Sequence, residues 1–109
     1  MDSDIFGISE LSRELANHPT EYLEFLNTPA LRTGLYELAA GATDTQEPHL
    51  EDEVYDVIRG LAKFDCEAKL KPVAPDEVVY VRAGVGHRFV DIEEDLQLLV
   101  FFSSIGSES

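Results

Sequence analysis

Residues 41–60 place three side chains that can bind metal, Glu47, His49 and Glu53, within seven residues. Glu47 and His49 are two residues apart, so on an extended strand both side chains leave the same face. Glu53 lies four residues beyond His49 and keeps the same parity. A regular strand, or one interrupted only by a short turn at 50–52, would therefore direct all three side chains into one interior.

The length and composition indicate a single folded domain. The chain has 109 residues, enough for one domain with a modest core, and 44% of them are hydrophobic. No apolar run reaches the ~18–20 residues that span a membrane, and the acidic start at 1–4 does not resemble a signal peptide. The only cysteine is Cys66, which excludes an intramolecular disulfide and fits a reducing compartment. We expect a cytoplasmic protein with no membrane partner.

The charge balance is strongly acidic, with 22 acidic residues against 8 basic ones and a formal net charge of −14. Such a chain is repelled by phosphate backbones and anionic membranes, so no nucleic-acid partner is expected. An acidic shell with few lysines also suits a salt-rich cytoplasm, where ions screen the self-repulsion. A halophilic source and an ordinary acidic bacterial protein are therefore equal alternatives.

Short strands separated by turn signals follow a short N-terminal helix. The helix is expected within residues 2–19, with Ser9 as its N-cap. A tight hairpin is expected at 59–60 and an acidic turn at 93–95. About eight strands of this kind are typical of an antiparallel barrel or jelly roll, although periodicity does not distinguish it from another small β-sandwich. The clearest strands are predicted at 22–26, 31–40, 54–58, 77–82 and 96–102.

The spacing within residues 41–60 resembles the first sequence motif of the cupin superfamily. That motif reads glycine, five residues, His-X-His, three or four residues, glutamate, six residues and glycine. His49 and Glu53 match it, whereas Glu47 stands where the first histidine is usual.

Residues 76–87 look like the second cupin motif, which reads glycine, five residues, Pro-X-Gly, two residues and histidine. Gly84 and His87 match, while Arg82 and Asp76 stand where proline and glycine are usual. Two half-motifs in this order, with about fifteen residues between them, are more specific than either alone.

The resemblance implies an all-β fold, an antiparallel jelly-roll β-barrel over residues 20–104. A helical segment at 1–19 would precede the barrel, and a polar tail at 105–109 would follow it. Cupins are commonly dimers, and the run at 96–102 is apolar on both faces. The barrel interior can cover only one of these faces, so either the N-terminal helix or a second chain must cover the other. We expect a homodimer.

The same resemblance implies one divalent transition metal ion, zinc, manganese or iron, held by Glu47, His49, Glu53 and His87. Two imidazoles and one carboxylate with open positions suit such ions. Glu47 has three possible roles: a fourth ligand, a carboxylate that orients bound water or acts as a base, or a solvated acid.

One cupin fold hosts many chemistries, so the function has several alternatives. The first is a metal-dependent enzyme, of dioxygenase, isomerase or lyase type, acting on a small molecule inside the barrel. The second is a non-catalytic module that binds a metal or a small molecule, and the third is a scaffold whose site has decayed. Tyr36, Tyr55 and Phe89 are candidates for lining a substrate pocket, although aromatic residues on strands are usually core. The sequence assigns no catalytic residue.

Overall fold

The computed structural model describes residues 3–45 and 48–103. Glu47 and the predicted tail at 105–109 lie outside the described residues. These described residues form one helix, α1 (Ile8–Ala16), and six strands, whose bounds follow in chain order. They are β1 (Tyr22–Asn27), β2 (Leu31–Leu38), β3 (Glu53–Cys66), β4 (Lys69–Val73), β5 (Val78–Val81) and β6 (His87–Ser103).

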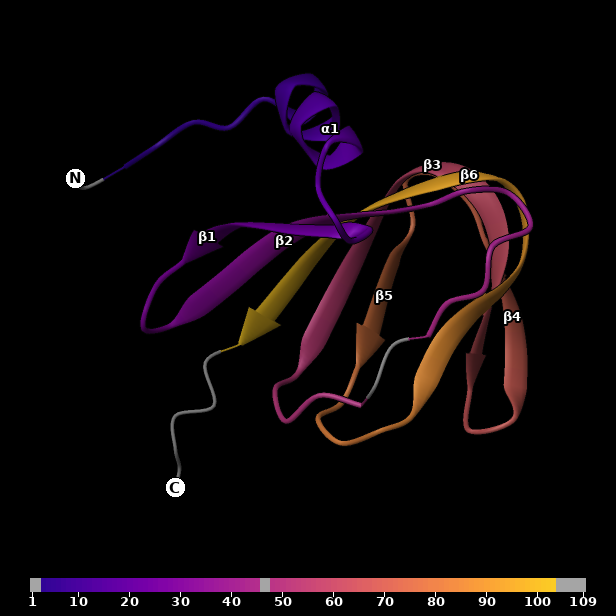
Figure 1. Cartoon of the computed structure of the whole chain (residues 1–109). Coiled ribbons are helices and arrows are strands. Elements are labelled where there is room, and N and C mark those ends of the chain that lie inside the picture. The colour runs from indigo at the N-terminus through magenta and orange to yellow at the C-terminus, as the bar shows by residue number, and fades with distance from the viewer. Residues whose placement is uncertain (1–2, 46–47, 104–109) are drawn as a thin grey trace.

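The strands form one curled antiparallel sheet in the order β1-β2-β6-β3-β4, with β5 also paired to β3 (Figure 1). Every strand pairing is antiparallel. One edge of β3 pairs with β5 along its first residues and with β4 along its last, while the other edge pairs with β6. This is the antiparallel jelly-roll β-barrel with a short N-terminal helix that the sequence motifs predict.

The predicted hairpin at 59–60 is wrong, because β3 runs through it without reversing. The acidic turn predicted at 93–95 is wrong for the same reason, because these residues lie within β6. The two long strands pair with each other over most of their length, and the register shifts three times between residues 57 and 63. β-Bulges of this kind bend a strand without ending it, so turn-forming residues here produce curvature instead of a reversal.

Gly60 lies at this bend and has a φ of +103°, a conformation that side chains with a Cβ rarely adopt. A Cβ at this position would lie 2.5 Å from the carbonyl oxygen of Asp95 and 2.6 Å from Cα of Leu96. Glycine therefore lets β3 and β6 approach closely where both strands bend.

The two faces of the sheet have different covers. The concave face holds the main core, which includes Tyr55, Leu98 and Val100, each at most 2% exposed. On the other face, α1 lies over β1 and β2 and buries Leu11 and Leu15 in a second cluster (Figure 1). Leu99 of β6 packs against this second cluster, so the helix supplies one of the two covers that the apolar run at 96–102 requires.

The helix begins two residues earlier than a Ser9 cap would require, and that prediction is wrong. Gly7 occupies the N-cap position, and no side chain caps the helix there. The hydroxyl of Ser12 donates a hydrogen bond of 2.7 Å to the carboxylate of Glu37 on β2, which ties α1 to the sheet. In the described part of the chain, no helix has the length and apolar character needed to cross a membrane.

Candidate metal and ligand site

A cavity of about 250 Å³ opens on the concave side of the sheet. Its walls come from β1, β2, β6, the start of β3 and the loop before β3. The lining residues are Tyr22, Arg32, Tyr36, Thr45, His49, Glu53, Val100 and Phe102. Two of the predicted metal ligands and one of the predicted pocket aromatics are therefore at one cavity.

Glu53, which lines the cavity, forms a buried pair with His87. Their side chains are each 1% exposed, and Nε2 of His87 lies 3.1 Å from Oε1 of Glu53. The hydroxyl of Tyr55 lies 2.9 Å from the same Nε2 atom. His87 is the first residue of β6, whereas Glu53 and Tyr55 lie at the start of β3. The barrel therefore brings together groups that are more than thirty residues apart in the sequence.

The other ring nitrogen of His87 determines which tautomer the neutral ring adopts. Nδ1 lies 2.9 Å from the carbonyl oxygen of Val85 and donates to it, because a carbonyl can only accept. Nε2 of the neutral ring is then the acceptor, with the Tyr55 hydroxyl 2.9 Å away, and this is the tautomer in which a histidine can bind a metal through Nε2.

Burial alone would lower the pKa of His87, but its contact with the Glu53 carboxylate and its hydrogen bond to Val85 outweigh burial. The net result is a pKa raised above the ordinary value of histidine. The Glu53 carboxylate thus stabilises a positive charge at this position, whether that charge is a proton or another cation.

Glu53 has less than a full set of partners. Neither of its carboxylate oxygens has a well-directed hydrogen bond among the described residues, although Oε1 contacts the His87 ring. A buried carboxylate without such bonds costs free energy unless a cation compensates it. The donor set of one carboxylate and one Nε2 lone pair therefore fits a divalent transition metal.

The other two predicted ligands are His49 and Glu47. His49 lies at the wall of the same cavity with its ring against Phe102, 4.8 Å between centroids, and Glu47 is outside the described residues. Within residues 3–45 and 48–103 there is no group of three histidine, cysteine or acidic side chains arranged to hold a metal. The described residues thus form one pair of candidate ligands, Glu53 and His87. They also place His49 at the wall of the cavity that Glu53 lines.

Backbone contacts tie the two motif segments together. The amide of Gly84, in the turn before His87, donates a 2.7 Å hydrogen bond to the carbonyl of His49. The amide of Ala83 donates to the carboxylate of Asp52 at 2.9 Å. Asp44 anchors the start of the His49 loop, because its carboxylate accepts from the Tyr36 hydroxyl at 2.7 Å and from the Phe89 amide at 2.8 Å.

The three aromatic residues predicted to line a pocket have different positions. Tyr36 lies in the cavity wall and holds Asp44 through its hydroxyl, and burial followed by that hydrogen bond raises its pKa well above the ordinary value. Tyr55 and Phe89 are 0% and 1% exposed and meet edge to face, with ring centroids 5.0 Å apart. Neither ring lines the cavity, and both belong to the core cluster.

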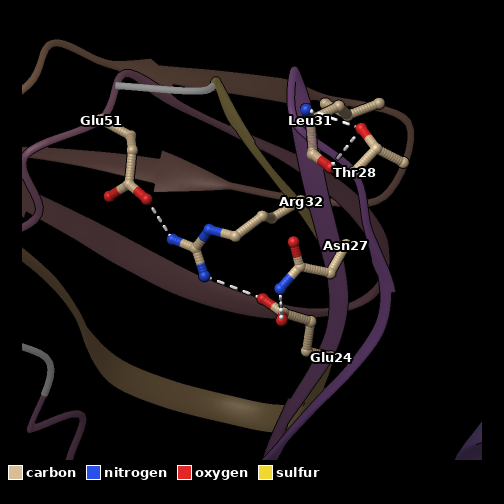
Figure 2. A network of polar contacts seen from close by, with 6 residues as sticks. All are labelled: Glu24, Asn27, Thr28, Leu31, Arg32 and Glu51. Carbon is tan, nitrogen blue, oxygen red and sulfur yellow. Dashed lines mark hydrogen bonds and ion pairs between the residues drawn. The ribbon is translucent and has the colours of Figure 1, made fainter. Parts of the chain in front are cut away.

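Arg32 is a cavity residue that sequence analysis overlooked. Its guanidinium lies over the Phe102 ring, 4.6 Å from the centroid. It donates to Glu24 at 2.8 Å and also to Glu51, and Glu24 accepts a further hydrogen bond from Asn27 (Figure 2). Because Arg32 has the same strand parity as Tyr36, the predicted strand at 31–40 already placed both side chains on one face.

A second cavity, about 570 Å³, lies between β4 and β5. Its lining includes Lys69, Lys71 and Tyr80 but neither His49 nor His87. Although this cavity is larger, the buried Glu53 carboxylate lines only the smaller one of the two. We therefore take the smaller cavity as the candidate site.

An uncharacterised protein of Streptomyces coelicolor is 47% identical over 98 residues, which cover 90% of this chain and 93% of that protein. No family model matches the sequence.

Solved structures with the same fold come from several bacteria. KdgF from a Halomonas species aligns over 76% of each chain with 21% identity and a TM-score of 0.69. A cupin superfamily protein from Desulfitobacterium hafniense covers 75% of this chain and 74% of its own, with 17% identity and a TM-score of 0.68. The DMSP lyase DddQ from Ruegeria pomeroyi is 17% identical with a TM-score of 0.72, over 81% of this chain and 48% of its own. At these identities the likeness defines the fold.

The jelly roll and its structural neighbours define the cupin fold. The chain belongs to the same family as the Streptomyces coelicolor protein.

Proposed function

We propose that this cupin binds one divalent transition metal ion, zinc, manganese or iron, and acts on a small molecule in the 250 Å³ cavity. His49, Glu53 and His87 would hold the metal, and Glu47 would supply a fourth ligand or a nearby carboxylate. The observation that supports this most is Glu53, which is 1% exposed and lacks a well-directed hydrogen-bond partner among the described residues. A neighbouring Nε2 lone pair makes a cation the natural compensation.

When bound, such a metal supplies Lewis-acid or redox chemistry at a position open to substrate. The chain's own residues bind and position: the rings of Tyr36 and Phe102 provide apolar walls, and burial of Glu53 keeps water from its carboxylate. The DMSP lyase DddQ has the same fold, which is compatible with a lyase, an isomerase or a dioxygenase here. The alternative is a cupin that binds a metal or a small molecule without catalysis.

The first test is metal content. Protein purified without chelators should contain close to one transition-metal ion per chain by elemental analysis. The double variant His49→Ala/His87→Ala should lose it, because two of the proposed nitrogen ligands are gone. Glu47→Gln should weaken binding if Glu47 is a ligand and leave metal content intact if it is not.

A matched control comes from the third histidine. His18 lies just after α1 and is exposed, so His18→Ala should leave the metal content unchanged. Wild-type metal content in the double variant would refute this proposed site.

We also propose that the protein is a homodimer. On the outside of the barrel, Val78 and Tyr80 on β5 and Leu70 on β4 are 67%, 61% and 56% exposed. Among the described residues β5 pairs only with β3, so its other edge can accept a second chain. Light scattering should give twice the mass of one chain in both physiological and molar salt. A monomeric mass in both would exclude the dimer.

A cytoplasmic location and the absence of nucleic-acid and membrane partners complete the proposal, on the grounds of charge and cysteine usage.

The proposal of a halophilic source is tested by measuring thermal stability at two salt concentrations. Raising NaCl from 0.1 M to 1 M shortens the Debye length from ~10 Å to ~3 Å, which should weaken repulsion among the acidic side chains. The Tm should therefore rise across this range. A flat or falling Tm would favour an ordinary acidic protein.

A further inference from the structure

Tyr22 is held over the candidate cavity by a glycine on the neighbouring strand. The β1–β2 register pairs Tyr22 with Tyr36 and Glu24 with Gly34, and the Tyr22 ring leans along β2 across Gly34. A Cβ at position 34 would lie 2.2 Å from both Cζ and the hydroxyl oxygen of Tyr22. The ring can therefore occupy this place only because residue 34 has no side chain.

The hydroxyl at the end of the Tyr22 side chain is buried and has no hydrogen-bond partner among the described residues. The Tyr22 ring lines the cavity beside Tyr36 and Phe102. Tyr36 differs, because its hydroxyl is engaged by Asp44 at 2.7 Å. An unsatisfied buried hydroxyl is destabilising, so its retention at a cavity wall suggests a partner beyond the described residues, and a bound ligand would supply one.

The hydroxyl of Tyr22 is available as a donor at physiological pH. Burial, and then the negative charge of Glu24, raises the pKa of Tyr22 far above its ordinary value, despite the opposing charge of Arg32. The proton therefore stays on the oxygen, and the group can donate to a ligand acceptor.

The charges around the cavity argue against an anionic ligand. Arg32, which lines the cavity, is already paired with Glu24 and Glu51 (Figure 2), and the Glu53 carboxylate lines the cavity as well. A cavity of 250 Å³ is also smaller than the ~300–1,000 Å³ typical of sites for drug-sized ligands. A small uncharged molecule with polar oxygens meets both conditions.

We propose that the hydroxyl of Tyr22 is a ligand-recognition group that donates a hydrogen bond to an oxygen of a small, uncharged hydroxyl- or carbonyl-bearing molecule in this cavity. Gly34 is its positioning residue. This inference rests on the proposed small-molecule function, but it requires no particular metal.

The first experiment measures stability without ligand. Tyr22→Phe removes an unsatisfied buried hydroxyl and keeps the ring, so the Tm of the ligand-free protein should rise by several degrees. Tyr80→Phe is the matched control, because Tyr80 is 61% exposed, and its Tm should stay at the wild-type value. An unchanged or lower Tm for Tyr22→Phe would overturn the inference.

The second experiment measures recognition with hydroxyacetone, which carries both a carbonyl and a hydroxyl, by NMR titration of isotopically labelled protein. We expect the wild type to bind it and Tyr22→Phe to bind about 2- to 10-fold more weakly, the range for one neutral hydrogen bond. Propionate, an anion of similar size, should bind more weakly than hydroxyacetone. Failure of hydroxyacetone to bind the wild type, or stronger binding of propionate, would overturn the ligand class, and equal affinity in Tyr22→Phe would overturn the role of the hydroxyl.

The positioning role of Gly34 is tested by a pair of glycine variants. Gly34→Ala displaces the Tyr22 ring and should weaken hydroxyacetone binding at least as much as Tyr22→Phe. Gly86→Ala is the control, because a Cβ there meets no atom within 4 Å. Equal weakening in both variants would overturn the role of Gly34. Elemental analysis of the same samples separates this inference from the metal proposal. Tyr22→Phe should keep the wild-type metal content whatever the histidine variants do. The role of Tyr22 can therefore hold even where the metal site is refuted.

Discussion

His87→Ala is expected to lower the free energy of unfolding of metal-free protein by about 3–5 kcal/mol, the cost of breaking a buried charge pair. The variant leaves the Glu53 carboxylate, 1% exposed, without the ring that contacts it at 3.1 Å. It also removes the Nε2 atom that the Tyr55 hydroxyl contacts at 2.9 Å. Chemical denaturation at neutral pH, with a chelator present, measures the change.

Two further variants separate a buried pair from general loss of packing. His49→Ala removes only a half-buried ring in contact with Phe102, so about 0.5–1.5 kcal/mol should be lost. Adding Glu53→Gln to His87→Ala removes the unpaired charge and should recover part of the stability. If the double variant is less stable than His87→Ala by the full cost of Glu53→Gln alone, the two side chains are not coupled and the prediction fails.

Gly60→Ala is expected to cost roughly 2–5 kcal/mol, the sum of backbone strain and overpacking. The alanine must adopt a φ of +103°, and its methyl group would lie 2.5 Å from the backbone oxygen of Asp95. Rotating a side chain cannot relieve this contact, because the opposing atom belongs to the backbone of β6. The midpoint of denaturant unfolding should fall accordingly.

Gly84→Ala is the matched control for this effect. Gly84 also has a positive φ, +80°, but a Cβ there meets no atom within 4 Å. The free energy of unfolding of this variant should therefore fall only by the strain of a left-handed conformation, about 1–2 kcal/mol. Similar losses in both variants would show that the close approach of β3 and β6 at Gly60 carries no energetic weight.

The cupin jelly roll could be predicted from two short motifs because metal ligands and glycines at fixed spacings reflect strand parity and turns. The spacing of His49, Glu53 and Gly60 marks the start of β3, and Gly84 and His87 mark the start of β6. The strands at 22–26 and 31–40 were also predictable from local pattern, and each corresponds to an observed strand. The hairpin at 59–60 was wrong because glycine is favoured in bulges and in turns alike.

The composition of the cavity depends on long-range register, which local patterns do not contain. Tyr22, Arg32 and Phe102 come together because β1, β2 and β6 pair with specific partners, and residues on three strands then share one concave face. The pairing of β3 with β6 puts Tyr55 and Phe89 into the core although their strand parity also allowed a pocket. The alternation of side chains along a strand assigns each residue to one face of the sheet. Strand pairing and sheet curvature then determine which neighbours the residue meets on that face.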